Sequence, residues 1–140
     1  MTLKSISTTE VEYVAHRLAK ETMDWDEPIP GFNSRFPNIL ESCLTTPFMT
    51  FRKKPLYKGL LEKTAILFYL MIKNHPFQNG NKRIAMTSLF YLLYKNKKWL
   101  KVNNRELYNF AKWVAESNPK LKTETTKAIE KFIKTYIVKL

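Results

Sequence analysis

Residue types that can carry out chemistry gather in one short segment, His75 to Arg83, whose sequence is HPFQNGNKR. A histidine side chain can take a proton from an attacking hydroxyl near neutral pH, and His75 opens the segment. At its far end, Gly80 and Asn81 stand where a helix is expected to begin, and the unpaired N–H groups of a helix start bind anions. A histidine before a proline is on its own more often a helix-end residue, so the case for catalysis depends on these neighbours. Together they predict a base that faces a bound phosphate.

Two cations follow the glycine, Lys82 and Arg83. A cation at a helix N-terminus opposes the helix dipole, at a cost of roughly a few tenths of a kcal/mol. A bound phosphate explains their presence, because charge-assisted hydrogen bonds from cations to phosphate are strong. The chain has only three glycines, which excludes Walker-type and dinucleotide-type glycine patterns. The predicted anion site consists of Gly80, Asn81, Lys82 and Arg83.

Two residues between these ends have predicted roles of their own. Asn79 can place a carbonyl oxygen on a magnesium ion held by nucleotide phosphates, although asparagine before glycine is also common in plain turns. Phe77 is expected to be buried between the flanking helices, where its ring would anchor the loop. The segment thus predicts one metal position and one structural anchor.

Hydrophobic periodicity predicts an all-α fold in which the helices before and after the loop are the central ones. Pro76 requires the first of them to stop near His75. No repeat or linker divides the chain, so residues 1–140 are predicted to form a single domain, a bundle of about six helices. The expected helices are one capped at Thr9–Glu12 and ending near Glu21, then 37–44, 57–74, 81–95, 103–117 and 121 to the C-terminus. The inward face of the first is expected to carry Val11, Val14, Ala15 and Leu18.

A different pattern occupies residues 45–56, where β-branched and aromatic residues lie between Pro47 and Pro55. Proline at both margins is typical of an exposed strand edge that avoids permanent pairing. Such an edge can accept an extended peptide from a partner. The segment therefore predicts either a short hairpin with this use or a plain surface loop.

The net charge of +12, from 24 basic and 12 acidic residues, favours anionic partners. Many lysines recur at helical intervals, as on a solvated face, and no nucleic-acid-binding motif accompanies them, so nucleic acid is not the expected partner. The longest apolar stretch, Ala65 to Ile72, is too short to cross a bilayer, and the N-terminus has no signal-peptide pattern. A single cysteine, Cys43, is expected to be buried, which suits a reducing compartment. These features predict a cytoplasmic protein without a membrane partner.

The loop segment resembles the signature of the Fic/Doc family, His-x-Phe-x-(Asp/Glu/Asn)-(Gly/Ala)-Asn-(Gly/Lys)-Arg, which lies between two core helices. The likeness covers residues 8 to 125, including the helix before the loop. Lys82 stands where most Fic adenylyltransferases have glycine, and Met86 where they have a second arginine, which is similar to the Doc (death-on-curing) branch. The resemblance implies a helical bundle with a small flap. It also implies a toxin that transfers the terminal phosphate of ATP, with Mg²⁺, to a hydroxyl of elongation factor Tu.

Carried over to this chain, the resemblance implies His75 as general base, Asn79 as the metal position and Phe77 as the loop anchor. Asn79 supplies a neutral oxygen where many active members have Asp or Glu, so weaker magnesium binding and reduced activity are an alternative outcome. The anion site corresponds to Gly80, Asn81, Lys82 and Arg83. The flap that aligns the target corresponds to Phe48, Met49, Thr50 and Phe51.

Two other functions stay open at this stage. One is transfer of AMP, as in Fic-type protein adenylyltransferases. The other is a catalytically weak binding module that uses its positive charge to hold nucleic acid. The family's self-inhibitory helix carries Ser/Thr-x-x-x-Glu-(Gly/Asn), and neither Thr8–Glu12 nor Thr126–Glu130 continues that pattern. The resemblance therefore implies that inhibition comes from a small antitoxin supplied as a separate chain.

Overall fold

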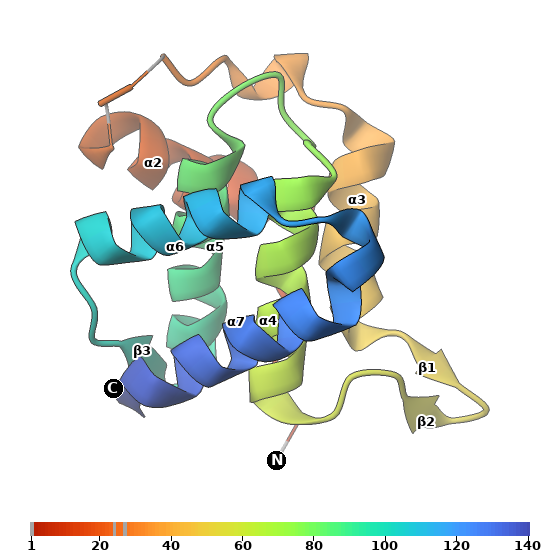
Figure 1. The fold of residues 1–140 in the computed structure, drawn as a ribbon. Coiled ribbons are helices and arrows are strands. Elements are labelled where there is room, and N and C mark those ends of the chain that lie inside the picture. The colour runs from red at the N-terminus through yellow and green to blue at the C-terminus, as the bar shows by residue number, and fades with distance from the viewer. Residues whose placement is uncertain (1, 24, 27) are drawn as a thin grey trace.

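The computed structural model describes residues 2–23, 25–26 and 28–140, and its architecture is helical with two small pairs of antiparallel strands (Figure 1). This architecture confirms the all-α fold class predicted from the sequence. In the N-terminal half the elements are α1 (Thr8–Glu10), the π-helical turn η1 (Val11–His16), α2 (Arg17–Thr22), η2 (Phe32–Ser34), α3 (Pro37–Thr45), η3 (Thr46–Phe48), β1 (Thr50–Phe51), β2 (Lys54–Pro55) and α4 (Gly59–Lys73). The remaining elements are α5 (Asn81–Lys95), β3 (Lys98–Leu100), α6 (Asn104–Glu116), η4 (Pro119–Leu121), α7 (Lys122–Tyr136) and β4 (Ile137–Lys139).

The first helix runs without a break through α1, η1 and α2, and its start differs from the prediction. Its N-cap is Ser7, whose side chain accepts a hydrogen bond from the Glu10 N–H. The Glu10 carboxylate accepts one from the Ser7 N–H in return. The capping box predicted at Thr9 and Glu12 is therefore wrong, because the same Ser/Thr-x-x-Glu pattern occurs two residues earlier, at Ser7 and Glu10, and is the one used.

The inward face of this helix also differs from the prediction. Val11 and Ala15 are fully buried as expected, together with Ala19, whereas Val14 is half-buried and Leu18 is 43% exposed. The π-helical turn η1 explains the difference, because its i→i+5 bonding widens the turn and aligns residues four apart on one face. The prediction of Leu18 as a core residue is wrong, and its side chain lines a surface groove instead.

The helices α4 and α5 form the centre of the bundle, and α6 and α7 lie across them (Figure 1). From Lys63 to Ile72 every residue of α4 is buried, as expected of a central helix. The loop between α4 and α5 therefore starts and ends on two elements that are fixed by the core. The inward face of α5 is buried as well, and it carries Ile84, Ala85, Ser88, Leu89, Leu92 and Leu93.

Short strands occur at two places. The pair β1–β2 follows α3, so of the two alternatives predicted for this segment the structure contains the hairpin. The pair β3–β4, which brings Trp99 opposite Val138, was not predicted. Three residues are too few for an alternating pattern to show, and the two strands are separated by α6 and α7. Because β4 begins at Ile137, α7 ends at Tyr136, and the prediction that the last helix reaches the C-terminus is wrong.

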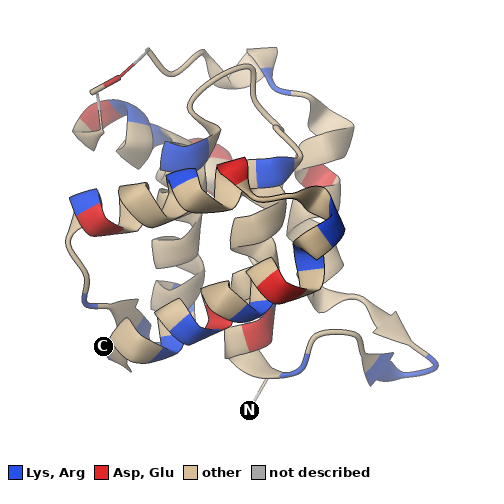
Figure 2. Ribbon diagram, in the orientation of Figure 1, with Lys and Arg blue, Asp and Glu red and all other residues tan. Residues whose placement is uncertain are grey.

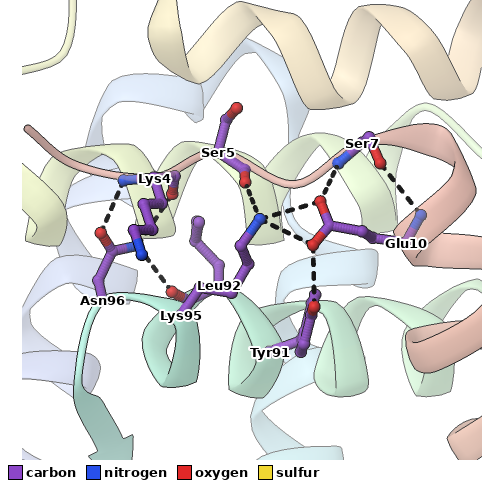
Figure 3. Close-up of polar contacts among 8 residues, drawn as sticks. All are labelled: Lys4, Ser5, Ser7, Glu10, Tyr91, Leu92, Lys95 and Asn96. Atoms are coloured by element: carbon purple, nitrogen blue, oxygen red, sulfur yellow. Dashed lines mark hydrogen bonds and ion pairs between the residues drawn. The ribbon is translucent and has the colours of Figure 1, made fainter.

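The N-terminal segment is fastened to the end of α5 through Glu10 (Figure 3). The Glu10 carboxylate accepts a hydrogen bond from Tyr91 Oη at 2.9 Å and forms an ion pair with Lys95 Nζ at 2.7 Å. Lys95 also donates to the Ser5 carbonyl oxygen at 2.8 Å. Burial alone would raise the pKa of Glu10, but the hydrogen bonds from Lys95, the Ser7 N–H and Tyr91 outweigh it and hold the pKa below its usual value.

Two further predictions concern Cys43 and membrane-spanning helices. Cys43 is fully buried, and burial raises the pKa of its thiol to about 12, which confirms the prediction of a structural cysteine. Within the described ranges, no helix combines the length and the hydrophobicity that crossing a membrane requires.

Candidate functional site

The loop between α4 and α5 depends on Gly80. Its φ is +77°, in the left-handed region, and a Cβ at this position would lie 2.8 Å from Cγ1 of Ile29. Both the backbone conformation and the nearby Ile29 side chain therefore disfavour a larger residue. Gly80 is also the N-cap of α5, and within the described residues no side-chain oxygen caps the first turn. The N–H groups of a helix start in this condition can bind an anion.

His75 lies at the other end of the loop with its backbone in a strained conformation. Its φ is +51°, which is uncommon for a residue with a side chain, and its ring is exposed. The ring Nδ1 lies 3.4 Å from Nδ2 of Asn81, and Nε2 has no hydrogen-bonding partner among the residues that the structure describes. Strain of this kind is often found at functional sites, where the surrounding contacts maintain it. One ring nitrogen thus faces the loop and the other is accessible to a substrate.

Asn81 holds the loop closed. Its Oδ1 accepts a hydrogen bond from the Phe77 N–H at 2.9 Å, and its Nδ2 donates to the Phe77 carbonyl oxygen at 2.8 Å. The side chain is buried, so these bonds satisfy groups that water does not reach. Asn81 can therefore contribute to the predicted anion site only through its backbone, while its amide fixes the loop and lies beside His75.

Arg83 donates hydrogen bonds to the backbone at the end of the first helix and just after it. Its Nη1 donates to the carbonyl oxygens of Met23 at 3.0 Å and Trp25 at 2.7 Å, and its Cζ lies 5.7 Å from the centre of the Trp25 ring. Only 2% of the residue is exposed. Arg83 belongs to the first turn of α5, but its Nη1 donates to these two carbonyl groups.

Lys82 has a different environment from its neighbour. It is half-buried, and its ammonium makes no hydrogen bond or ion pair with any residue in the described part of the chain. An uncompensated cation at a helix N-terminus opposes the dipole there. Of the two predicted side-chain cations, Lys82 is therefore the one whose ammonium has no partner among the described residues.

Phe77 is buried as predicted, with 1% of its surface exposed. Its ring packs against two residues that the sequence analysis did not single out. The ring of His16 lies 5.7 Å away and that of Phe32 lies 5.9 Å away, between centroids. The loop is thus anchored to the first helix and to η2 as well as to the two core helices.

Residues 28–36, to which the sequence analysis gave no role, border the loop. The Phe36 N–H donates to the Pro76 carbonyl oxygen at 2.9 Å. Nδ2 of Asn79 donates to the Pro28 carbonyl oxygen at 3.2 Å. Nε2 of His16 lies 2.8 Å from the Pro30 carbonyl oxygen. The sequence gives no signal for these contacts, because backbone carbonyl groups make them and the segment has no hydrophobic periodicity. The repeated prolines were nonetheless a sign of a fixed backbone.

The predicted metal position offers one neutral ligand. Asn79 is half-buried next to Pro28, and an amide oxygen is a ligand that magnesium accepts. Among the described residues, no group of three or more His, Cys, Asp or Glu side chains could hold a metal ion. One neutral amide oxygen would suit only a magnesium ion that is held mainly by nucleotide phosphates, and Asn79 would then be its protein ligand.

A cavity of about 460 Å³ lies beside the Arg83 end of the loop, since Trp25 forms part of its wall. The Trp25 and Tyr108 rings meet edge to face at 4.5 Å, and the Tyr108 hydroxyl donates to Asp26 at 2.9 Å. The rest of the wall comes from α6 and carries two cations. The lining residues are Trp25, Asn104, Arg105, Tyr108, Asn109 and Lys112.

The predicted flap is not brought to His75. The residues Phe48, Met49, Thr50 and Phe51 precede α4, whereas His75 follows it, and Figure 1 shows the hairpin and the loop at opposite ends of this helix. With 15 residues, α4 separates them by roughly 22 Å at the usual helical rise. The hairpin is therefore remote from the base and the anion site, and residues 28–36 border the loop instead.

A comparison with protein-family models shows which family the chain belongs to. The Fic/DOC family model matches residues 5–93, more than half of the chain, including the whole loop from His75 to Arg83. The chain therefore belongs to the Fic/DOC family. No match was found among curated proteins, and none among solved structures. Members of this family are typically transferases that act on proteins with a nucleotide-derived group.

Proposed function

We propose that this chain is a Doc-type protein phosphotransferase, which moves the terminal phosphate of ATP to a hydroxyl of a target protein. One observation carries the proposal. An exposed imidazole, that of His75, and an uncapped helix start with a cation, Lys82, lie at the two ends of one short loop that the Asn81 amide holds closed. A proton acceptor and a phosphate site are the two parts that such a transfer needs.

The reaction balances with these groups. The target hydroxyl attacks the terminal phosphorus and its proton passes to a ring nitrogen of His75. The bond from that phosphorus to the bridging oxygen breaks, and ADP leaves with the electron pair. The N–H groups of the first turn of α5 and the Lys82 ammonium oppose the negative charge on the phosphoryl oxygens. Magnesium, when bound to the nucleotide and Asn79, would neutralise phosphate charge.

Space for the rest of ATP is present beside Arg83. The cavity there is walled by Trp25 and Tyr108, whose apolar rings can pack against a base, and by Arg105 and Lys112, which add positive charge. The buried guanidinium of Arg83 adds a fixed charge between this cavity and the start of α5. These features support ATP as the second substrate.

Two positions support transfer of the terminal phosphate rather than of AMP. Lys82 occupies space that a glycine would leave to a phosphate, and it brings its own charge. Met86, where a second arginine would stand in the resemblance drawn above, is fully buried in the core. Position 86 thus supplies no charge to hold the outer phosphates of a nucleotide that gives up AMP.

The biological role proposed with this activity is that of a cytoplasmic toxin. By the resemblance drawn from the sequence, the target is elongation factor Tu, and its modification arrests translation. Restraint would come from a cognate antitoxin supplied as a separate chain, because neither Thr8–Glu12 nor Thr126–Glu130 continues the family's self-inhibitory pattern.

The test is to incubate the purified protein and elongation factor Tu with ATP labelled at either the α or the γ phosphate. Label from the γ position in the factor supports the proposal, and label from the α position shows adenylyl transfer and refutes it. The His75→Ala variant should transfer neither label. Growth arrest that persists with alanine at position 75 would refute both enzymatic activities and favour a binding module.

A further inference from the structure

The hairpin β1–β2 has a two-residue turn at its tip and is held at its base by contacts of Lys63. Its two-residue turn is made by Arg52 and Lys53, whose φ values of +52° and +66° are those that two-residue hairpin turns require. At its base, Nζ of the buried Lys63 donates to the Tyr57 carbonyl oxygen and lies 5.4 Å from the centre of the Phe48 ring. Lys63 thus joins the residues just before and just after the hairpin, so the hairpin projects from the bundle at a fixed place.

The hairpin exposes apolar side chains that its own fold does not bury. Met49 is 49% exposed, Phe51 is 62% exposed and Leu56 is 50% exposed. All four strand residues of β1 and β2 are exposed as well. Apolar side chains grouped on a projecting element are typical of an interaction site.

Only one edge of the hairpin can accept another strand. Across a two-residue turn, Phe51 and Lys54 form the hydrogen-bonded pair, so the backbone polar groups of Thr50 and Pro55 face outward. Pro55 has no N–H, which prevents regular pairing at the β2 edge. Thr50 has both an N–H and a carbonyl group. The β1 edge is therefore the one open to an extended segment.

The hairpin is also strongly basic. Arg52, Lys53 and Lys54 follow one another at its tip, and Figure 2 shows no acidic residue on it. The sequence has no Asp or Glu between Glu41 and Glu62. No carboxylate within the described residues forms an ion pair with any of these three cations. Their charge is thus not balanced by any carboxylate of the described residues.

From these observations we infer that the β1 edge of the hairpin is a docking site for an acidic, extended segment of the protein that the enzyme modifies. The segment would add a strand beside Thr50, place apolar side chains on Phe51 and Met49, and pair its carboxylates with the cations at the tip. Because the hairpin and His75 lie at opposite ends of α4, this segment would be distinct from the one that carries the acceptor hydroxyl. The inference rests on the proposed function for the identity of the occupant.

The test measures binding without ATP, so its result does not depend on catalysis. The probe is a fluorescein-labelled peptide of alternating Glu and Val, followed by fluorescence anisotropy at low salt. A matched peptide with Gln for Glu and a peptide with N-methylated backbone positions test charge and strand pairing separately. The variant carries Arg52→Asn, Lys53→Asn and Lys54→Gln, because asparagine tolerates the positive φ of the turn. The control variant carries Lys20→Gln, Lys131→Gln and Lys134→Gln, which removes the same charge from exposed helix positions away from the hairpin.

The Glu peptide should bind about tenfold more weakly to the hairpin variant than to the wild type, with little change in the control variant. The Gln and N-methylated peptides should also bind more weakly, and added salt should weaken the Glu peptide most. Equal losses in both variants, or no preference for Glu over Gln, would overturn the inference, as would absence of binding. His75→Ala should bind the Glu peptide as the wild type does. If the wild type binds the Glu peptide but transfers no label, the proposed reaction is refuted and the docking site stands. If it transfers label but does not bind the peptide, the docking site is refuted and the reaction stands.

Discussion

The side-chain amide of Asn81 spans the backbone of Phe77, accepting a hydrogen bond from its N–H at 2.9 Å and donating one to its carbonyl oxygen at 2.8 Å. These two bonds fix the orientation of the amide, because only Nδ2 can donate and only Oδ1 can accept. The orientation places Nδ2 at 3.4 Å from Nδ1 of His75. One buried residue thus closes the loop and faces the proposed base, so stability and activity should both depend on it.

Asn81→Ala should destabilise the protein and also reduce transfer. It leaves the Phe77 N–H and carbonyl group without their partner, and a buried unsatisfied polar group costs about 1–3 kcal/mol. Urea denaturation should show a lower midpoint, and label transfer from γ-labelled ATP should fall more than the loss of folded protein explains. Asn38→Ala, at an exposed position of α3, is the control and should change neither quantity. An Asn81→Ala variant with wild-type stability would show that the two hydrogen bonds between Asn81 and Phe77 are not needed.

His75→Ala should abolish transfer while leaving the protein folded. Loss of a general base typically costs roughly 100- to 10,000-fold in rate. The residue is exposed, and within the described part of the chain the one hydrogen-bonding contact of its ring is the long one to Asn81, so little stability should be lost. His75→Asn is the better-matched variant, since asparagine tolerates the φ of +51°. Asn74→Ala, at the neighbouring exposed position, serves as the control, and retained activity in either His75 variant would remove the base from the mechanism.

The central helices and their loop were predictable from the sequence for physical reasons. A helix such as α4, with apolar residues around most of its circumference, is expected to be central. Pro76 ends it, and glycine at position 80 lets α5 begin abruptly. The burial of Phe77 followed, since an apolar ring between two core helices has no other place. The geometry of the loop was thus largely encoded in local sequence.

The interactions that make the site specific were not predictable in this way. The sequence shows a cation at position 83, but the contacts of its Nη1 with the carbonyl groups of Met23 and Trp25 depend on where the fold places those two residues. His16 gives no signal because its partner is the carbonyl group of Pro30, in a segment without periodicity. The hairpin and the loop are close in sequence but far apart in space, because the uninterrupted helix α4 lies between them.

Glu10 should make the protein less stable in acid. Its pKa is held below the usual 4.5 in the folded chain, chiefly because hydrogen bonds from Lys95, the Ser7 N–H and Tyr91 outweigh the effect of burial. A carboxyl group with a lowered pKa contributes stability above its unfolded pKa, and the contribution is lost as the pH falls through the folded pKa. Stability measured by urea denaturation should therefore fall below about pH 4.5 in the wild type and less steeply in Glu10→Gln. Glu12→Gln, on the same helix, is the control, and equal slopes for wild type and Glu10→Gln would contradict the linkage.

Gly80→Ala should destabilise the start of α5 for two separable reasons. The φ of +77° costs a residue with a Cβ about 1–2 kcal/mol, and the added Cβ would lie 2.8 Å from Cγ1 of Ile29. Ile29→Ala removes that carbon and with it the clash, but it leaves the backbone cost in place. The free energy lost through Gly80→Ala should therefore be smaller in the Ile29→Ala background than in the wild type, and it should stay above zero. An equal loss in both backgrounds would mean that Ile29 moves aside without cost, so that backbone conformation alone requires the glycine at the proposed phosphate site.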